Sequence, residues 1–338
     1  MATMKEVADY AHVSVATVSR VINNSGYVSP DLEERVRTAM QALNYHPSAL
    51  ARSLRRQETQ TIGLLIPQLD LPFFSTLAHA VEHMLFDMEY RILVCSAEED
   101  AEREQAYTQM LIRQRVDGVI MAPTGHSAVN LRSLIDANVP VVLVDRDVPE
   151  QRVSKVLVDN VEGGHLGMSH LLAHGHRRVG IIGAPAHSTS VRQRLDGAQR
   201  ALREHGIHDV KVSLSANEST PFEFGYRVGL EMLARPDRPT AIFALTDVSA
   251  VGVMHAAAHH GLRIPADLSL LGFDNIPLTS YIIPELSTVG QPIREMGEIA
   301  ARQMLRSIAE RDARPETFTL HTRLIERQSV AQVPAKGA

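Results

Sequence analysis

From Thr61 onward, short apolar runs alternate with longer stretches in which apolar positions recur at the spacing of a helix, as in residues 74–86 and 103–114. Near-continuous apolar strands separated by helices are typical of parallel sheets that are covered on both faces. The pattern therefore predicts an α/β fold. Its strands are expected at residues 61–67, 91–97, 118–123, 140–145, 155–159, 178–185, 240–245 and 268–274.

So many strands exceed what one small dinucleotide-binding unit holds, and no G-x-G-x-x-G follows the first of them. Two doubly wound domains that face one another explain the pattern better. The chain has 338 residues, of which 44 % are hydrophobic and 22 % charged. These are ordinary values for a globular protein, and the length suffices for about two domains.

Residues 1–60 contain no strand-like run, so a domain boundary is expected near residues 57–60. Ser14 can cap a helix, and Pro30 suits the first position of another. Two short helices joined by a tight turn, with a third that completes the core, are typical of a helix-turn-helix unit. The helices are predicted over residues 5–11, 15–23 and 30–43.

In a helix-turn-helix unit the second helix enters the major groove, and its exposed first turn meets the base edges. Arg20 can donate two hydrogen bonds to guanine, whereas Val15 and Ala16 offer only methyl contacts, for example to thymine. The same spacing also suits a three-helix packing module whose polar residues merely face solvent. The DNA-binding interpretation assigns base contacts to Val15, Ala16, Thr17 and Arg20, and phosphate contacts to Ser14, Thr17, Ser19 and Asn23.

The formal net charge of −5 argues against bulk attraction to nucleic acid. Residues 1–60, however, hold seven cations and six anions, so the acidic excess lies in the rest of the chain. The single cysteine, Cys95, cannot close an intrachain disulfide, and the N-terminus lacks the features of a secretory signal. No apolar run approaches the ~20 residues that cross a bilayer. We therefore expect a cytoplasmic protein.

Three motifs carry a resemblance to a known family. They are V-A-x-x-A-x-V-S-x-x-T-V-S-R-V-I-N at 7–23, V-S-P at 28–30 and N-Y-x-P-S-A-x-A-R-S-L at 44–54. Through them the segment resembles the DNA-binding headpiece of the lactose/galactose-repressor (LacI/GalR) family, and the resemblance extends to R-L-I-E-R-Q-S-V at 323–330. His12 departs from the Gly that the family usually has at this turn, which needs a positive φ.

The resemblance implies a helix-turn-helix domain over residues 1–46 and a hinge over 47–60 that becomes helical only on DNA. Leu54 matches the family's leucine wedge, which enters the minor groove with its dimer mate and kinks the operator. Ala51, Ser53 and Arg55 flank this wedge. Without the family, the same segment is a good helix former with a modest apolar face and a solvated run of arginines.

The rest of the chain resembles the two-lobed periplasmic-binding-protein fold of parallel doubly wound sheets that these repressors use as a sensor. One lobe is expected at residues 61–160 with 290–322, and the other at 161–289 with 323–335. The resemblance implies a homodimeric repressor that binds double-stranded, pseudo-palindromic operator DNA. A small ligand between the lobes, a monosaccharide or sugar derivative, would control it allosterically.

Ligand contacts are expected where strands end, because open α/β sheets bind ligands there. Carboxylates at such positions accept hydrogen bonds from vicinal hydroxyls, and arginine supplies a fork of donors. By position the candidates are Asp145, Arg146, Arg192 and Asp274. The resemblance adds Gln291 at a crossover, Thr246 in place of a common Asn, and the pair Phe73 and Phe74, which packs on a sugar ring or a base.

These candidates also have plainer interpretations. Asp145 and Asp274 suit loop carboxylates that accept backbone N–H groups, and the two phenylalanines suit a core. Arg194 is expected to point elsewhere and to pair with a carboxylate. Leu71 and Thr246 stand where pentose binders often have amides, and the family's distal aromatic falls near Thr220 unless Phe222 substitutes. A plain copy of the ribose or purine site is therefore not expected.

Proteins with other functions would show different sequence features. A sugar-binding protein would need a secretory signal, and a sugar-processing enzyme would need a nucleophile elbow, a phosphate loop or an acid–base pair, none of which the sequence contains. We therefore expect no enzyme. A global regulator with a phosphocarrier partner remains an alternative. The histidines at 255 and 259 and at 170, 174 and 176 lack a convergent thiolate or carboxylate, so neither a metal nor a cofactor is expected.

Overall fold

The computed structural model describes residues 2–23, 25–45, 58–124, 127–183, 185–208, 210–214 and 220–333. The chain divides into two compact units, Met1–Thr59 and Gln60–Ala338. Within the described residues, none of the helices combines the length and the apolar character needed to cross a membrane.

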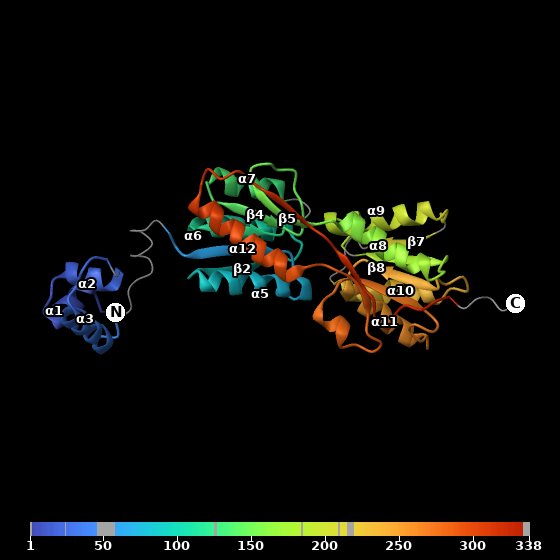
Figure 1. Cartoon of the computed structure of the whole chain (residues 1–338), viewed down its shortest axis with the longest axis horizontal. Coiled ribbons are helices and arrows are strands. Elements are labelled where there is room, and N and C mark those ends of the chain that lie inside the picture. The colour runs from blue at the N-terminus through green and yellow to red at the C-terminus, as the bar shows by residue number, and fades with distance from the viewer. Residues whose placement is uncertain are drawn as a thin grey trace. The chain divides into compact units, whose positions relative to one another are not determined.

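The first unit packs three short helices around an aliphatic core (Figure 1). Helix α1 (Met4–Ala11) begins with a capping box, in which the side chains of Thr3 and Glu6 each accept the other's backbone N–H. Helix α2 (Val15–Asn23) follows a three-residue turn, and α3 (Pro30–Ala42) has its proline in the first turn. The buried core consists of Val7, Ala8, Ala11, Val18, Val36 and Ala39.

The turn between α1 and α2 is held from α3. His12 ends α1 with φ 52 and ψ 47, in the left-handed region. The Arg35 guanidinium donates to the backbone oxygens of Ala11, at 2.7 Å, and His12, at 3.3 Å. These oxygens lie at the C-terminal end of α1, where a cation interacts favourably with the helix dipole. Arg35 therefore ties α3 to the turn that sets the direction of α2.

The second unit consists of two lobes, each an α/β sandwich with helices on both faces of a sheet (Figure 1). In the first lobe the strand order is β11-β5-β4-β3-β1-β2, and all the pairs are parallel. Helices α5 (Pro72–Asp87) and α12 (Ile293–Ala309) cover one face, and α6 (Ala101–Gln114) and α7 (Ala128–Asp136) cover the other. The strands are β1 (Thr61–Ile66), β2 (Arg91–Ser96), β3 (Gly118–Met121), β4 (Val141–Val144), β5 (Ser154–Val158) and β11 (Thr317–Leu320).

In the second lobe the order is β12-β10-β9-β8-β6-β7, and only β12, among the described strands, runs antiparallel to its neighbour. Helices α8 (Asn160–Ala173) and α9 (Thr189–Glu204) cover one face, and α10 (Pro221–Leu233) and α11 (Asp247–His259) the other. A 3₁₀ turn, η1 (Pro277–Ser280), follows β9. The strands are β6 (Val179–Gly183), β7 (Lys211–Leu214), β8 (Ala241–Ala244), β9 (Ser269–Asp274), β10 (Ser287–Gly290) and β12 (Arg323–Ile325).

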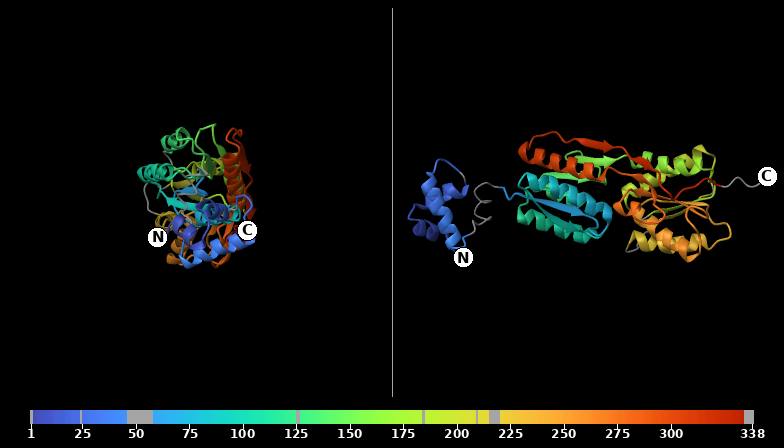
Figure 2. Two further views of the ribbon diagram at one scale, coloured as in Figure 1. Left: turned by 90° about the vertical axis from the view of Figure 1, so that its left-hand side faces the viewer. Right: turned by 60° about the horizontal axis from the view of Figure 1, so that its bottom comes forward.

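The chain passes between the lobes three times, after β5, after β10 and after β11. The right-hand view of Figure 2 shows the two lobes side by side, with the ends of the chain's parallel strands between them. Helices α8 and α9 approach so closely that a Cβ on Gly164 would lie 1.9 Å from the Arg194 oxygen, and one on Gly197 would lie 1.8 Å from the Val161 oxygen. These two glycines therefore fix where the first turns of α9 lie.

We expect His12→Gly to stabilise the first unit by about 1 kcal/mol, because the left-handed conformation costs an L residue ~1–2 kcal/mol and glycine loses more chain entropy on folding. Hydrogen exchange of the α1 and α2 amides in the full chain measures the effect. His12→Ala removes the imidazole without relieving the backbone and should give no stabilisation. Unchanged or lower protection in His12→Gly would show that the turn is unstrained.

Candidate functional site

The expected base-reading residues lie on the exposed side of α2. Val15, Ala16 and Arg20 are exposed, whereas Val18 is buried in the core. The Ser14 hydroxyl caps α2 by accepting the Thr17 N–H at 3.0 Å. The face that the sequence assigns to bases is thus available to a ligand, and the residue behind it is structural.

The side chains of the remaining expected DNA contacts are less exposed to solvent or fall outside the described residues. The Asn23 side-chain amide donates to the Ser19 backbone oxygen at 2.6 Å, within its own helix. The expected hinge contacts Ala51, Ser53, Leu54 and Arg55 lie in residues 46–57, outside the described part of the chain.

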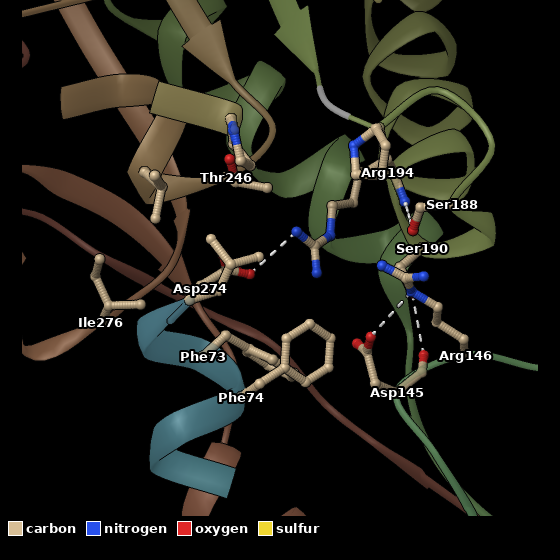
Figure 3. Close-up of a pocket in the computed structure, with 15 residues that line it drawn as sticks. Phe73, Phe74, Asp145, Arg146, Ser188, Ser190, Arg194, Thr246, Asp274 and Ile276 are labelled. Atoms are coloured by element: carbon tan, nitrogen blue, oxygen red, sulfur yellow. Dashed lines mark hydrogen bonds and ion pairs between the residues drawn. The ribbon is translucent and has the colours of Figure 1, made fainter. Parts of the chain in front are cut away.

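A cavity lies between the two lobes, where strands of both sheets end (Figure 3). The space between its walls, which includes the mouth open to solvent, is about 520 Å³. Phe73 and Phe74, at the start of α5, form one wall, with ring centroids 5.0 Å apart and planes at 89°. The cavity brings together six of the expected ligand contacts, namely Phe73, Phe74, Asp145, Arg146, Thr246 and Asp274.

Arg194 forms the opposite wall and is held in four ways. Its Nε donates to the Asn160 side chain at 2.9 Å, and its Nη1 donates to the Leu245 oxygen at 2.7 Å. Nη1 also lies 3.0 Å from Asp274 Oδ1, and the guanidinium stacks on Phe273 at 3.9 Å from the ring centroid. The side chain is only 4 % exposed. Arg194 therefore presents a rigid cation to the cavity.

Asp274 is the last residue of the buried strand β9 and has φ 117. Burial raises its pKa to about 6, although Arg194 and a hydrogen bond from Gln291 oppose the shift. Asp247 lies behind it, fully buried, and burial and the charge of Asp274 raise the pKa of Asp247 well above its usual range. The Asp247 carboxylate accepts from the Thr288 hydroxyl at 2.7 Å and from the Ile276 N–H at 2.9 Å.

Asp145 and Arg146 follow strand β4. The Arg146 guanidinium makes a bidentate pair with Glu99, with distances of 2.8 and 2.6 Å, and its Nε lies 3.6 Å from Asp145 Oδ2. Burial raises the pKa of Asp145, and Arg146 and Arg194 oppose that shift. Burial would also raise the pKa of Glu99, but Arg146 and His187 outweigh it and lower this pKa to about 2. Glu99 is thus a fixed anion beside the cavity.

The positions expected for Arg192 and Arg194 relative to the cavity are wrong. Arg192 is exposed, donates from Nε to the Ala186 oxygen at 2.7 Å, and does not line the cavity. Arg194 does pair with a carboxylate, as expected, but it does so inside the cavity. The reason is that α9 already begins at Thr189, so Arg192 lies within the helix, whose buried face carries Ser190, Val191 and Arg194.

Three further expectations are modified. Gln291 is buried and does not line the cavity; it reaches the site only through its hydrogen bond to Asp274. Thr246 lines the cavity, but its hydroxyl also caps α11 by accepting the Ser249 N–H at 3.2 Å. Phe222 packs on His255 at 5.5 Å and supplies no clamp, and Pro221 lines the cavity instead.

Several lining or supporting residues were not anticipated from the sequence: Glu99, Asn160, His187, Ser188, Ser190 and Asp247. The helical spacing of the buried positions in α9 was the available signal for Ser190 and Arg194. Among the described residues, no group of three or more His, Cys, Asp or Glu side chains is arranged to hold a metal ion.

Comparisons with known proteins agree with this architecture. Residues 3–48 match the family described as bacterial regulatory proteins, lacI family, and residues 168–330 match a periplasmic binding protein-like domain. The HTH-type transcriptional repressor PurR of Proteus mirabilis (strain HI4320) is 36 % identical over 337 residues, which cover 99 % of this chain and 98 % of the relative.

Solved structures give the same result. The lac repressor dimer bound to operator and the anti-inducer ONPF has a TM-score of 0.86 at 28 % identity, covering 98 % of this chain and 99 % of that one. A LacI family regulator from Enterococcus faecium with bound ribose has a TM-score of 0.75 at 30 % identity, covering 81 % and 99 %. The chain therefore belongs to the lacI family of bacterial regulatory proteins, as a ligand-controlled, DNA-binding transcriptional regulator and not an enzyme.

Proposed function

We propose that this regulator is a homodimeric repressor whose effector is an uncharged monosaccharide or close sugar derivative, bound in the cavity between the lobes. The observation that carries the proposal is the Arg194–Asp274 pair. It sets a donor fork beside a carboxylate acceptor at 3.0 Å, across the cavity from the Phe73–Phe74 wall. Adjacent sugar hydroxyls need this combination of donor, acceptor and apolar face.

The hydrogen bonds of Arg194 support this role. Nε and Nη1 are used inside the protein, and no partner of Nη2 is found among the described residues. Arg194 lines the cavity, so Nη2 is available to a ligand oxygen. We propose that Arg194 and Asp274 bind the effector directly and that Gln291 orients Asp274. Phe73, Phe74, Asp145, Arg146 and Thr246 complete the proposed contact set.

The charges around the cavity favour an uncharged ligand. Each buried guanidinium already faces a carboxylate, Arg146 with Glu99 at 2.6 Å and Arg194 with Asp274 at 3.0 Å. Asp145 adds a further buried acidic group. A sugar phosphate or sugar acid would bring another anion into a site without an unpaired cation, and an uncompensated buried charge is costly.

The DNA-binding part of the proposal follows from the first unit. One recognition helix covers only half of an operator, so two copies are needed for a pseudo-palindromic site. We infer that α2 reads bases through Val15, Ala16, Thr17 and Arg20. The hinge over residues 47–60, with Leu54 as the wedge, stays a prediction.

Exposed apolar side chains supply a candidate surface for the second copy. Ile283 is 93 % and Tyr281 80 % exposed, beside an apolar groove along α11. In the other lobe, Phe86 at the end of α5 and Met88 just after it are also exposed. Helices α5 and α11 lie on the lower side of the second unit in Figure 1, and this side comes forward in the right-hand view of Figure 2. Exposed patches of this kind mark interaction surfaces.

Arg194→Ala should abolish the thermal stabilisation that a neutral pentose or hexose gives the wild type, and weaken binding at least about 100-fold, because it leaves Asp274 buried without its cation. A thermal-shift panel of neutral sugars, their phosphates and uncharged nucleobases measures this. Arg192→Ala, on the exposed face of the same helix, is the matched control and should keep the response. Retained stabilisation in Arg194→Ala, or a larger shift from a sugar phosphate, would contradict the proposal.

The effector affinity should fall as the pH is lowered from 7 to 5. The pKa of Asp274 is about 6, so the carboxylate that accepts the sugar hydroxyl becomes protonated in this interval. Isothermal titration calorimetry with the effector at several pH values tests this. In Asp274→Asn the affinity should be lower at pH 7 and nearly independent of pH. An equally steep pH dependence in the variant would assign it to another group.

Ile283→Asp should weaken self-association at least about 100-fold, because it places a charge in an apolar interface without changing a buried residue. Sedimentation velocity over a concentration series measures the dimer fraction. Val129→Asp alters a side chain that is 66 % exposed on α7, away from this surface, and should leave the dimer intact. Equal behaviour of the two variants would place the interface elsewhere.

A further inference from the structure

A buried network at the edge of the cavity joins the two lobes. Glu99 lies in the loop between β2 and α6 of the first lobe, and its side chain is 15 % exposed. It binds Arg146 of the same lobe through both carboxylate oxygens, at 2.6 and 2.8 Å. Its Oε2 also lies 2.9 Å from Nε2 of His187, in the loop between β6 and α9 of the second lobe.

We propose that Glu99 is a positioning residue that couples the effector cavity to the arrangement of the lobes, by holding Arg146 at the cavity wall and binding His187 across the gap. The proposal rests on the proposed function in so far as Arg146 is an effector contact. Glu99 itself does not line the cavity, so it acts through the two side chains that it binds.

The backbone around Glu99 is specialised for this position. Glu98 and Glu99 have φ 53 and 55, so two consecutive residues adopt the left-handed conformation that L residues rarely take. Their side chains separate: Glu98 pairs with Arg103 in the first lobe, whereas Glu99 is directed to Arg146 and His187. The strained turn thus places one of two adjacent carboxylates in the contact between the lobes.

Arg146 provides the link to the effector. Its side chain is 7 % exposed, and its Nε is a buried donor that makes no hydrogen bond among the described residues, with Asp145 Oδ2 3.6 Å away as an ion-pair partner. The closed arrangement of the lobes, defined by the Glu99–His187 contact, therefore contains a buried donor without a hydrogen bond, which disfavours it. A ligand hydroxyl in the cavity can accept from Nε. The effector would then favour the closed arrangement, as a ligand that shifts a two-state equilibrium must.

A second contact between the lobes lies beside the network. The Ser190 hydroxyl, from the first turn of α9, donates to the Asp145 backbone oxygen at 3.1 Å. A second cavity shares Arg146 and Ser188 with the first and is also lined by Val148 and Pro149 from the first lobe and by His187 and Thr189 from the second. Thr189 lines only this second cavity, so a probe at Thr189 reports the lobe separation from outside the effector cavity.

The chain contains no tryptophan, so Thr189→Trp introduces a single fluorescent reporter at an exposed position facing the first lobe. In this background, Glu99→Gln and His187→Ala should each increase acrylamide quenching of the indole about twofold or more, because the open arrangement becomes populated. His187→Ala leaves the Arg146–Glu99 pair intact, so it separates the contact between lobes from any loss of stability. His187→Gln keeps a side-chain donor and should restore most of the shielding.

Glu98→Gln is the matched control, because it removes the neighbouring charge without touching the second lobe, and it should leave quenching unchanged. Unchanged quenching in both Glu99→Gln and His187→Ala would overturn the proposal. In a second arm, ribose and the other neutral sugars of the panel are titrated by thermal shift. Affinity for a sugar that binds the wild type should fall in His187→Ala by the factor by which the closed fraction falls.

The two arms distinguish the two proposals. If no sugar stabilises the wild type, the proposed effector class fails, while the quenching of the variants still decides whether Glu99 holds the lobes together. If quenching rises in His187→Ala and the sugar affinity does not change, the coupling of Glu99 to the effector cavity is wrong.

Discussion

The cavity between the lobes depends on two guanidinium groups that are buried where the parallel strands end. The Arg146 and Arg194 side chains are 7 % and 4 % exposed. A buried cation is tolerated only with a paired anion and satisfied donors, so each arginine requires its own partners. Arg194 has Asp274, Asn160 and the Leu245 oxygen, and Arg146 has Glu99. The partner of Arg146 lies in the loop after β2 of the first lobe, and the partners of Arg194 lie at the end of β9, after β8 and at the start of α8 in the second lobe. Each charge pair therefore determines which segments of its own lobe must meet at the cavity.

The topology of each sheet makes that meeting possible. Parallel strands bring their carboxyl ends to one edge, so Asp145 after β4 and Asp274 at the end of β9 face the same cavity although they belong to different sheets. The close contact of α8 and α9, which Gly164 and Gly197 permit, sets the first turns of α9 against the crossover after β5. Arg194 can therefore reach Asn160 on α8 and Asp274 on β9 at once.

The sequence predicts the fold well and the site in part, for identifiable reasons. Strands with long apolar runs are found where the pattern indicates them, because burial on both faces leaves a continuous signal. Strands β7, β11 and β12 gave no such signal, since they are only half-buried, and β10 is buried but has the sequence Ser-Thr-Val-Gly, which contains no apolar run. Residues at strand ends, such as Asp145 and Asp274, follow from position alone. Position after a strand favours Arg192 over Arg194, whereas the choice depends on the helical phase of α9, which begins at Thr189. Glu99 and His187 are 88 positions apart, and no local pattern indicates that they meet.

A regulator of this family changes its affinity for DNA only if the effector distinguishes between two arrangements of the lobes. If the cavity were rigid and all its polar groups were already hydrogen-bonded, effector binding would not change the arrangement of the lobes. In this chain Arg146, which lines the cavity, is incompletely hydrogen-bonded: its Nε is buried and makes no hydrogen bond among the described residues, with Asp145 Oδ2 3.6 Å away. A ligand oxygen that accepts from this Nε lowers the free energy of the closed arrangement relative to any arrangement in which water reaches the group. In the proposed coupling, the unused Nε donor of Arg146 is thus the group through which ligand binding favours one arrangement of the lobes.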